Sequence, residues 1–354
     1  MILKNKDKIM DFEQFQLAEI LKTASLVTDK TSPYPSFSNI TFTSDGICAM
    51  NMSCFLFAKM DLEIDKSFGV APELFSMIDS VKSDDIEINL KEGFLTIESA
   101  DMRGKLSYTE EINENLMIGI PDVKEFKDLP LNFVDSLKKI YKVSSKNEFE
   151  AETYCFLCDG KYVYTTNSAL VGRVELEMPI EKISNSEETS VLFPVDALKV
   201  LNEAQPLKYC ADSSWIFFES EFFALGFRQV EPGPKKPQII NLFGSENKWD
   251  YSPLPEDFKT IIDEASLFSD METGIETMRF EFKEDKLLIS SNNAKGQIHK
   301  FIDFQNKHNV NNFLINTKFV KMIAPFVDDF ASTNTFKIFK GEDVLFAVAN
   351  MTDI

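Results

Sequence analysis

The sequence predicts an α+β protein made of three tandem similar domains, each with two helices packed on antiparallel sheets. A unit of helix, antiparallel strands, second helix and further strands recurs three times along the 354 residues. A chain of this length is too long for a single hydrophobic core and fits two or three domains of ordinary size. Proline-bearing joints fall where units should end, at 118–130 and 246–258. We therefore expect domains at 1–122, 123–247 and 248–354.

The front half of each unit is an amphipathic helix followed by two strands around a turn. Apolar residues recur at helical spacing in the three expected first helices, 12–25, 131–144 and 255–269. The expected strand pairs that follow are 40–51, 154–167 and 278–292. Asp45-Gly46 and Asp159-Gly160 are residues that a tight hairpin turn favours.

The back half of each unit is a second helix followed by a hairpin. Setting Ala71, Pro194 and Asn316 in register aligns the three expected second helices, with offsets of 123 and 122 residues. These helices are expected within 70–78, 193–201 and 315–323, and their hairpins at 86–99, 208–220 and 336–348. Chance recurrence of apolar patterns does not account for a near-constant offset, so we interpret the units as repeated domains.

Composition is that of a soluble globular protein, with 44% hydrophobic and 27% charged residues. No apolar run approaches the ~20 residues that span a bilayer, so no membrane partner is expected. The N-terminus has no apolar segment of signal-peptide length, and Met10 is an alternative start. Five cysteines, an odd number scattered over a long chain, favour a reducing compartment. We expect a cytoplasmic protein.

Cys155 and Cys158 are the one cysteine pair with metal-ligand spacing. A zinc site needs two more ligands, and the two histidines, His299 and His308, are distant in sequence. The alternation around Cys155 indicates a strand instead. We expect buried strand cysteines, no metal and no cofactor.

An enzyme is not expected. The chain has no Gly-rich phosphate loop and no G-x-S-x-G nucleophile turn. A histidine-based centre would need His299 or His308, and His299 lies in an alternating, strand-like segment.

Several segments resemble the bacterial β-type DNA sliding clamps, the processivity factors of replicative polymerases. "FGVAPELFSMIDSV" resembles the strand-to-helix step of the family's first domain, and "LINTKFVKMI" resembles its third-domain F-N-x-x-Y-L-x-D-x-L segment. "YTTNSALVGRVELEMPI" resembles its A-T-D-G-H-R-L-A segment, although 168–171 departs from Gly-His-Arg-Leu. The resemblance extends from about Asp11 to the C-terminus, and such departures suit a phage-encoded as well as a bacterial clamp.

The resemblance implies a ring of two chains, closed head to tail around duplex DNA, because a closed cyclic assembly needs different surfaces at its two ends. The positions that match the family's dimer interface are Leu106, Tyr108, Leu267 and Phe268. Each of these also fits an ordinary core position.

The resemblance further implies that helices line the hole and hold phosphates without reading bases. The lysines on the expected helices are Lys22, Lys82, Lys138, Lys139, Lys142, Lys199, Lys259, Lys318 and Lys321. Carboxylates interrupt this stripe, and the net charge of −20 ordinarily counts against a nucleic-acid partner. Net charge does not say how charge is distributed, and an acidic outer rim around a less acidic bore agrees with both observations.

A second implied surface is an apolar cleft between the second and third domains. In the family this cleft takes short linear peptides from DNA polymerase, clamp loader and repair proteins, and apolar residues such as methionine suit such an adaptable pocket. The matching positions are Thr166, Val171, Leu242, Phe243, Phe319, Ala347, Ala349 and Met351.

Two other functions remain open. A repeat-built structural or interaction scaffold, such as a viral assembly protein, would use the same domains without encircling DNA. An acidic DNA mimic would need rows of acidic residues, whereas the charges here are interspersed with lysine.

Overall fold

The structure is a computed structural model of the whole chain. It describes every residue except 1, 6–7, 12–13, 61, 63, 83–85, 92, 111–124, 146–151, 183–188, 245, 270–275, 284, 294, 307, 309, 334 and 352–354. Helices and mainly antiparallel sheets make up the described part, so the predicted α+β class is confirmed.

The chain forms two compact units. The first contains 1–134, 182–188 and 196–229, and the second contains 135–181, 189–195 and 230–354. This division runs through the expected second domain, and the expected boundary at 122 lies outside the described residues. The boundaries of three repeated domains therefore stay a prediction.

The first unit is built on one long sheet. Its 13 strands have the order β10-β14-β15-β16-β5-β4-β3-β6-β9-β8-β7-β1-β2. The strands are β1 (Ile2–Asn5), β2 (Lys8–Asp11), β3 (Ile40–Thr43), β4 (Gly46–Met50), β5 (Cys54–Lys59), β6 (Phe68–Val70), β7 (Glu87–Lys91), β8 (Phe94–Glu98), β9 (Arg103–Thr109), β10 (Lys127–Asp128), β14 (Lys208–Ala211), β15 (Trp215–Glu219) and β16 (Ala224–Arg228).

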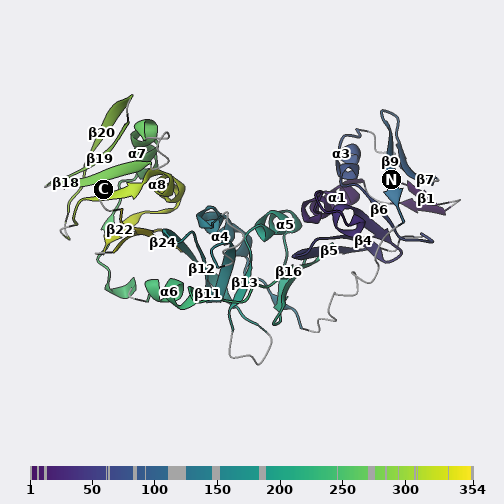
Figure 1. The fold of residues 1–354 in the computed structure, drawn as a ribbon, viewed down its shortest axis with the longest axis horizontal. Helices are drawn as coiled ribbons and strands as arrows, with labels where there is room; N and C mark the ends of the chain where they lie inside the picture. The colour runs from purple at the N-terminus through teal and green to yellow at the C-terminus, as the bar shows by residue number, and fades with distance from the viewer. Residues whose placement is uncertain are drawn as a thin grey trace. The chain divides into compact units, whose positions relative to one another are not determined.

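Helices cover one side of this sheet. Figure 1 shows α1 (Gln14–Val27), α3 (Glu73–Asp79) and α5 (Ala197–Ala204) on the same side of β4, β5 and β16. A fourth, short helix is α2 (Pro35–Ser38). The core-facing side of α1 is apolar, with Leu17, Ile20, Leu21 and Ala24 almost fully buried, and α1 contacts both α3 and α5. The helix is therefore held by its apolar stripe.

A strand pairing between distant segments makes this sheet continuous. β16 pairs antiparallel with β5, with Gly226 opposite Phe55. The Phe55 ring lies over Gly226 and packs on Trp215 and Phe217, at centroid distances of 5.6 and 6.2 Å. Glycine is needed at 226 because an added Cβ would lie 2.2 Å from the ring.

The described part of the second unit contains two sheets. The seven-stranded sheet has the order β13-β11-β12-β24-β23-β22-β17, and the four-stranded sheet the order β20-β19-β18-β21. The strands are β11 (Cys155–Thr166), β12 (Leu170–Ile180), β13 (Val191–Pro194), β17 (Ser252–Pro253), β18 (Thr277–Lys283), β19 (Lys286–Asn293), β20 (Gly296–Asp303), β21 (Phe313–Asn316), β22 (Asp329–Ser332), β23 (Phe336–Lys340) and β24 (Val344–Ala349). β12 pairs antiparallel with β24, which joins segments more than 160 residues apart.

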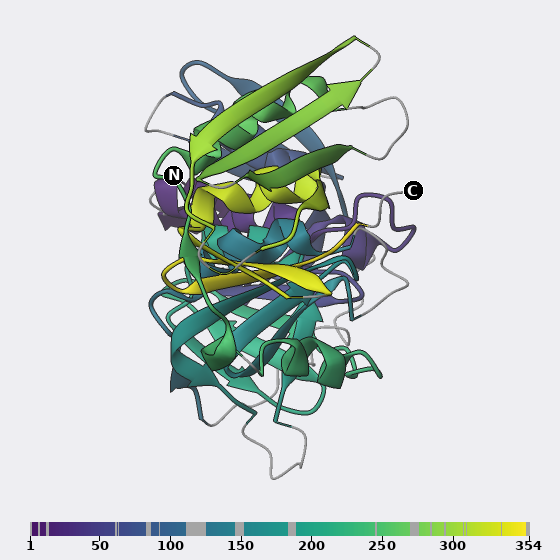
Figure 2. The ribbon, with the colours of Figure 1, turned by 90° about the vertical axis from the view of Figure 1, so that its left-hand side faces the viewer.

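The helices of the second unit begin with α4 (Phe133–Ile140), whose first two residues belong to the first unit. The others are α6 (Lys236–Leu242), α7 (Phe258–Ala265) and α8 (Thr317–Ile323), with the short 3-10 helices η2 (Tyr141–Val143), η3 (Glu246–Lys248), η4 (Ser266–Phe268) and η5 (Ala324–Phe326). Figure 2 shows α7 and α8 beside both the four-stranded sheet and the strands β22–β24.

Phenylalanine rings join the two sheets of the second unit. Phe330 of β22 stacks on Phe282 of β18 and Phe313 of β21, at centroid distances of 6.3 and 5.6 Å. Phe339 of β23 lies 5.2 Å from Phe330. Offset and tilted aromatic pairs of this kind add to the burial energy of the rings, so they hold the sheets in register.

α6 packs on the opposite face of the seven-stranded sheet from α4 (Figure 1). Ile239 and Phe243 at its C-terminal end are buried against that face. The Glu152 carboxylate accepts the backbone N–H groups of Lys235 and Lys236 at 2.9 and 3.0 Å. This carboxylate caps the first turn of α6 from more than 80 residues away, where the backbone donors lack helical partners.

The predicted hairpin at Asp159-Gly160 is confirmed inside β11, whose first half pairs with β13 and whose second half pairs with β12. The backbone N–H of Ser145 donates to the carbonyl groups of both Thr153 and Thr166, which can be neighbours only if the chain reverses between them. Gly160 has a φ of +61°, and the register with β12 shifts between Gly160 and Tyr162. The left-handed φ of Gly160 is the conformation that a tight hairpin turn requires, so the Asp-Gly pair has the role that the sequence predicted.

The other predicted elements are present, with shorter helices than expected. The hairpins at 40–51 and 278–292 are confirmed as β3–β4 and β18–β19. The expected helix 131–144 is α4 followed by η2, and 255–269 contains α7 and η4.

Candidate functional site

The predicted DNA-lining lysines all lie on or beside helices. Eight are exposed, and Lys139 is half-buried. Lys22 lies on α1, Lys138 and Lys139 on α4, Lys142 on η2, Lys199 on α5, Lys259 on α7, Lys318 and Lys321 on α8, and Lys82 just after α3.

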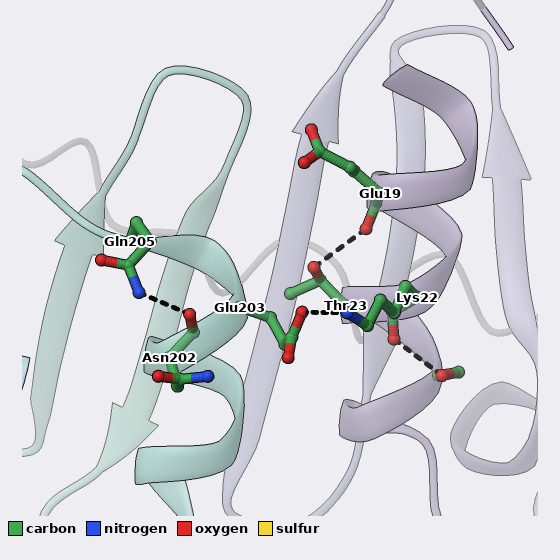
Figure 3. Close-up of polar contacts among 7 residues, drawn as sticks. Glu19, Lys22, Thr23, Asn202, Glu203 and Gln205 are labelled. Carbon is green, nitrogen blue, oxygen red and sulfur yellow. Dashed lines mark hydrogen bonds and ion pairs between the residues drawn. The ribbon is translucent and has the colours of Figure 1, made fainter. Parts of the chain in front are cut away.

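Four of these lysines are in ion pairs. The Nζ of Lys22 lies 2.5 Å from the Glu203 carboxylate, which joins α1 to α5 (Figure 3). The hydrogen bond to Glu203 raises the pKa of Lys22 against the opposing effect of burial. Figure 3 also shows Thr23 donating to the Glu19 backbone carbonyl, at 2.9 Å. The positive charge of Lys22 is thus compensated by the Glu203 carboxylate.

The other three pairs lie on α4 and beside α5. Lys138 contacts Asp135 at 2.8 Å and Lys199 contacts Asp196 at 3.4 Å, each one helical turn apart. Lys139 donates to both carboxylate oxygens of Asp343, at 2.6 and 2.7 Å. Within the described part of the chain, five of the predicted lysines have no ion pair: Lys82, Lys142, Lys259, Lys318 and Lys321.

Four of the eight predicted pocket residues meet in one apolar cluster. Phe243 and Ala347 are buried in it, and Val171 and Leu242 are partly buried against it. Val171 pairs with Ala347 across β12 and β24. Thr166 is buried and lies opposite Val171 in the β11–β12 ladder. The cluster therefore packs α6 and Phe243 against β11, β12 and β24.

The other three predicted pocket residues are not members of this cluster. Phe319 is on α8 and partly buried. Ala349 is exposed, and its backbone N–H donates to the Ala169 carbonyl at 2.8 Å. Met351 bridges to Leu314 and borders a cavity of about 540 Å³.

The sequence analysis did not identify Arg173 of β12, which holds η3 through Glu246 and contacts Phe243 of this cluster. Arg173 is 8% exposed, and its guanidinium lies 2.5 Å from the Glu246 carboxylate. It also stacks on the rings of Tyr162 and Phe243, at 4.4 and 5.0 Å. Arginine is suited to this position because its planar group can pair with an acid and stack on rings together. In the alternation of β12, Arg173 shares its face with Glu175 and Glu177, opposite the apolar Val174 and Leu176, so the sequence pattern did not indicate its burial.

The predicted dimer residues lie on the two units as follows. Leu106 and Tyr108 are half-buried on β9, and Tyr108 packs on Phe68 at 5.5 Å. Leu267 is 71% exposed on η4, and the Phe268 ring packs over Gly296 of β20.

β20 ends the four-stranded sheet and pairs only with β19 among the described strands. Phe301 on this strand is 65% exposed. Leu267 and Phe301 are therefore exposed apolar residues beside an open sheet edge, which can accept another strand.

The cysteines are free and buried. Cys155 and Cys158 lie three residues apart on a regular ladder, so their side chains point to opposite faces of the sheet. One metal ion cannot bind both, and no group of ligands suited to a metal occurs among the described residues. Burial raises the pKa of the Cys48, Cys54 and Cys155 thiols to about 12.

No helix among the described residues is both long and apolar enough to cross a membrane.

Comparison by sequence gives no match: no protein-family model fits the chain, and no curated protein is similar to it. Comparison by structure gives strong matches. The DNA polymerase III β subunit of Thermotoga maritima has a TM-score of 0.76 at 14% identity, covering 97% of this chain and 98% of that one. The DNA polymerase sliding clamp of Bacillus subtilis has a TM-score of 0.76 at 13% identity, with the same coverage. The DNA polymerase III β subunit of Pseudomonas aeruginosa has a TM-score of 0.75 at 13% identity, covering 96% and 98%.

These likenesses establish the fold. Nearly all of this chain follows nearly all of each of those chains, at an identity too low for sequence comparison to detect. The predicted sliding-clamp fold is therefore confirmed.

Proposed function

We propose that the protein is a DNA sliding clamp that tethers a replicative DNA polymerase, with no catalytic activity of its own. Two copies close head to tail around duplex DNA, and partner peptides bind between the second and third expected domains. The observation that supports this most strongly is the shared fold over at least 96% of the chain with proteins named as sliding clamps and polymerase β subunits. A fold alone supports many functions, so the site residues must carry the rest.

DNA contact in this proposal comes mainly from the lysines that have no described ion pair. Lys142, Lys259 and Lys321 are exposed on η2, α7 and α8, which all belong to the second unit. A lysine already paired with a carboxylate releases few counterions when a phosphate approaches, because its charge is largely compensated. We therefore expect the unpaired lysines to dominate the salt dependence of duplex binding.

The surface of η4 and β20 supports the head-to-tail interface. Leu267 and Phe301 are both more than half exposed, beside the open edge of β20. β9, which carries Leu106 and Tyr108, is bounded by β6 and β8 on its two sides. The two surfaces thus differ, as a heterologous contact requires.

The first experiment measures solution mass and shape together, by light scattering and small-angle X-ray scattering at several concentrations. A dimer with a central hole is expected. A compact or extended monomer at every concentration would contradict self-closure and favour the scaffold function. Leu267→Asp should shift the equilibrium toward monomer, whereas Leu26→Asp, at an exposed site on α1, should not.

The second experiment measures duplex binding against salt by fluorescence anisotropy. Replacing Lys142, Lys259 and Lys321 together by Ala should lower the slope of log K against log salt by about three. The matched control replaces three paired lysines, Lys22, Lys138 and Lys199, and should change the slope much less. Equal effects of the two triple variants would contradict the assignment of DNA contact to the unpaired lysines.

A further inference from the structure

A cavity of about 540 Å³ in the second unit combines an apolar wall with a buried cation. Trp249, Phe313 and Met351 form much of the apolar wall, and Lys337 of β23 lies among them. The volume suits an aryl acid or one or two amino-acid side chains. Most of the other lining residues are polar, so a ligand that packs on the apolar wall would also meet several hydrogen-bonding groups.

Lys337 is only 4% exposed, which is unusual for a lysine. Its Nζ donates to the Ser332 hydroxyl at 2.5 Å and lies 3.5 Å from the Thr333 carbonyl oxygen. It also lies 4.8 Å from the centre of the Phe313 ring. An ammonium has three donors, so at least one has no acceptor in the described part of the chain.

No carboxylate in the described residues lies within ion-pair distance of Lys337. Burial away from such a partner lowers the pKa of Lys337. A buried ammonium without an acid is costly, and a bound anion would remove that cost.

The charge on the cavity wall also favours an anion. Lys248 and His308 line the cavity together with Lys337, and Asp250 is the acidic residue among the lining residues. The chain as a whole has a net charge of −20. Two lysines against one aspartate give the described lining a positive net charge on an acidic protein, which attracts anions locally.

We propose that this cavity binds the carboxylate of a ligand whose apolar part packs on Trp249 and Phe313, with Lys337 as the cation that holds the carboxylate. A single buried lysine suits one monovalent group, whereas a phosphate is usually held by an arginine fork or several backbone N–H groups. This site is independent of DNA encirclement, so its test does not depend on the proposed clamp function.

The test follows the indole N–H resonance of Trp249 in 15N-labelled full-length protein. The chain has two tryptophans, and Trp215 in the first unit serves as an internal control. The probes are 3-phenylpropionate and its uncharged counterpart 3-phenylpropionamide. The carboxylate is expected to shift the Trp249 resonance and to bind about tenfold to a hundredfold more tightly than the amide, as one charge-assisted hydrogen bond implies.

Lys337→Met removes the charge and keeps most of the side-chain volume. It should abolish the preference for the carboxylate while the folded spectrum is retained. The matched control is Lys340→Met on the same strand, where the lysine lies over Tyr251 and outside the cavity wall. The control should keep the full preference.

Two sources of the carboxylate are distinguished by a second protein that lacks residues 352–354, which include Asp353. Binding of the probe by the full-length chain supports a separate ligand. Binding only by the shortened chain supports the site, with the chain's own carboxylates as its occupant. Equal binding of acid and amide, or no shift of Trp249 in either protein, would overturn the proposal.

Discussion

The contact between Phe55 and Gly226 gives a stability prediction with a defined sign. β5 and β16 are joined at this point, and an ideal Cβ on residue 226 would lie 2.2, 2.6 and 2.9 Å from three atoms of the Phe55 ring. Gly226→Ala therefore forces the ring to move, which costs about 1–3 kcal/mol as overpacking does in other cores.

Removing the ring has a larger effect by itself. Phe55 is 8% exposed and packs on Trp215 and Phe217. Phe55→Ala should cost about 3–5 kcal/mol, since it loses the buried ring and leaves a cavity. In the double variant the new methyl group enters the space that the ring has left. The combined cost should therefore be about 1–2 kcal/mol smaller than the sum of the single costs.

The assay is urea unfolding followed by tryptophan fluorescence and circular dichroism. Trp215 reports directly on this contact because its ring lies 5.6 Å from Phe55. The control cycle combines Gly226→Ala with Phe94→Ala, a ring that is 37% exposed on β8. The control effects should add. Additivity within about 0.5 kcal/mol in the Phe55 cycle would refute the reasoning, because it would mean that the ring and residue 226 do not compete for space.

Three further predictions concern other contacts. Glu152→Ala leaves two backbone donors of α6 without their acceptor and should lower the free energy of unfolding by about 1–2 kcal/mol, measured by urea unfolding; an unchanged midpoint would exclude the cap. The thiols of Cys48, Cys54 and Cys155 should not react with Ellman's reagent at pH 8 until urea is added, because burial raises each pKa to about 12; one fast equivalent from any of them would contradict this. Lys22 has a pKa raised above its ordinary 10.5 by Glu203, so the ion pair stabilises the fold below that pH and is lost as pH rises through the folded value. Lys22→Met should lower stability by about 0.5 kcal/mol at pH 8 and by less above pH ~11, and a difference that grows with pH would contradict the pairing.

Local pattern predicted most of the elements because each helix and strand carries its own periodicity. α1, α5 and α7 lie within or across the segments chosen from apolar spacing, and the β3–β4 hairpin lies at its Asp-Gly turn. The same rule held at Asp159-Gly160, where the chain turns back inside β11 and brings Thr153 beside Thr166.

The candidate site was predictable in residue type but not in pairing. Lysines on amphipathic helices are visible in the sequence, whereas Glu203 and Asp343, which neutralise two of them, are distant in the chain. The Val171–Phe243–Ala347 contact was expected only through resemblance to a known family, and Arg173 beneath it was missed.

The sequence by itself determined the α+β class, the repeated order of elements and the buried strand cysteines, since these depend on spacing along the chain. Tertiary structure alone decided that β16 pairs with β5 and β12 with β24, and that Lys337 is buried without a described acid. Strand edges carry the same backbone donors and acceptors whatever their sequence, so the partner of an edge is fixed by which apolar faces can be buried together.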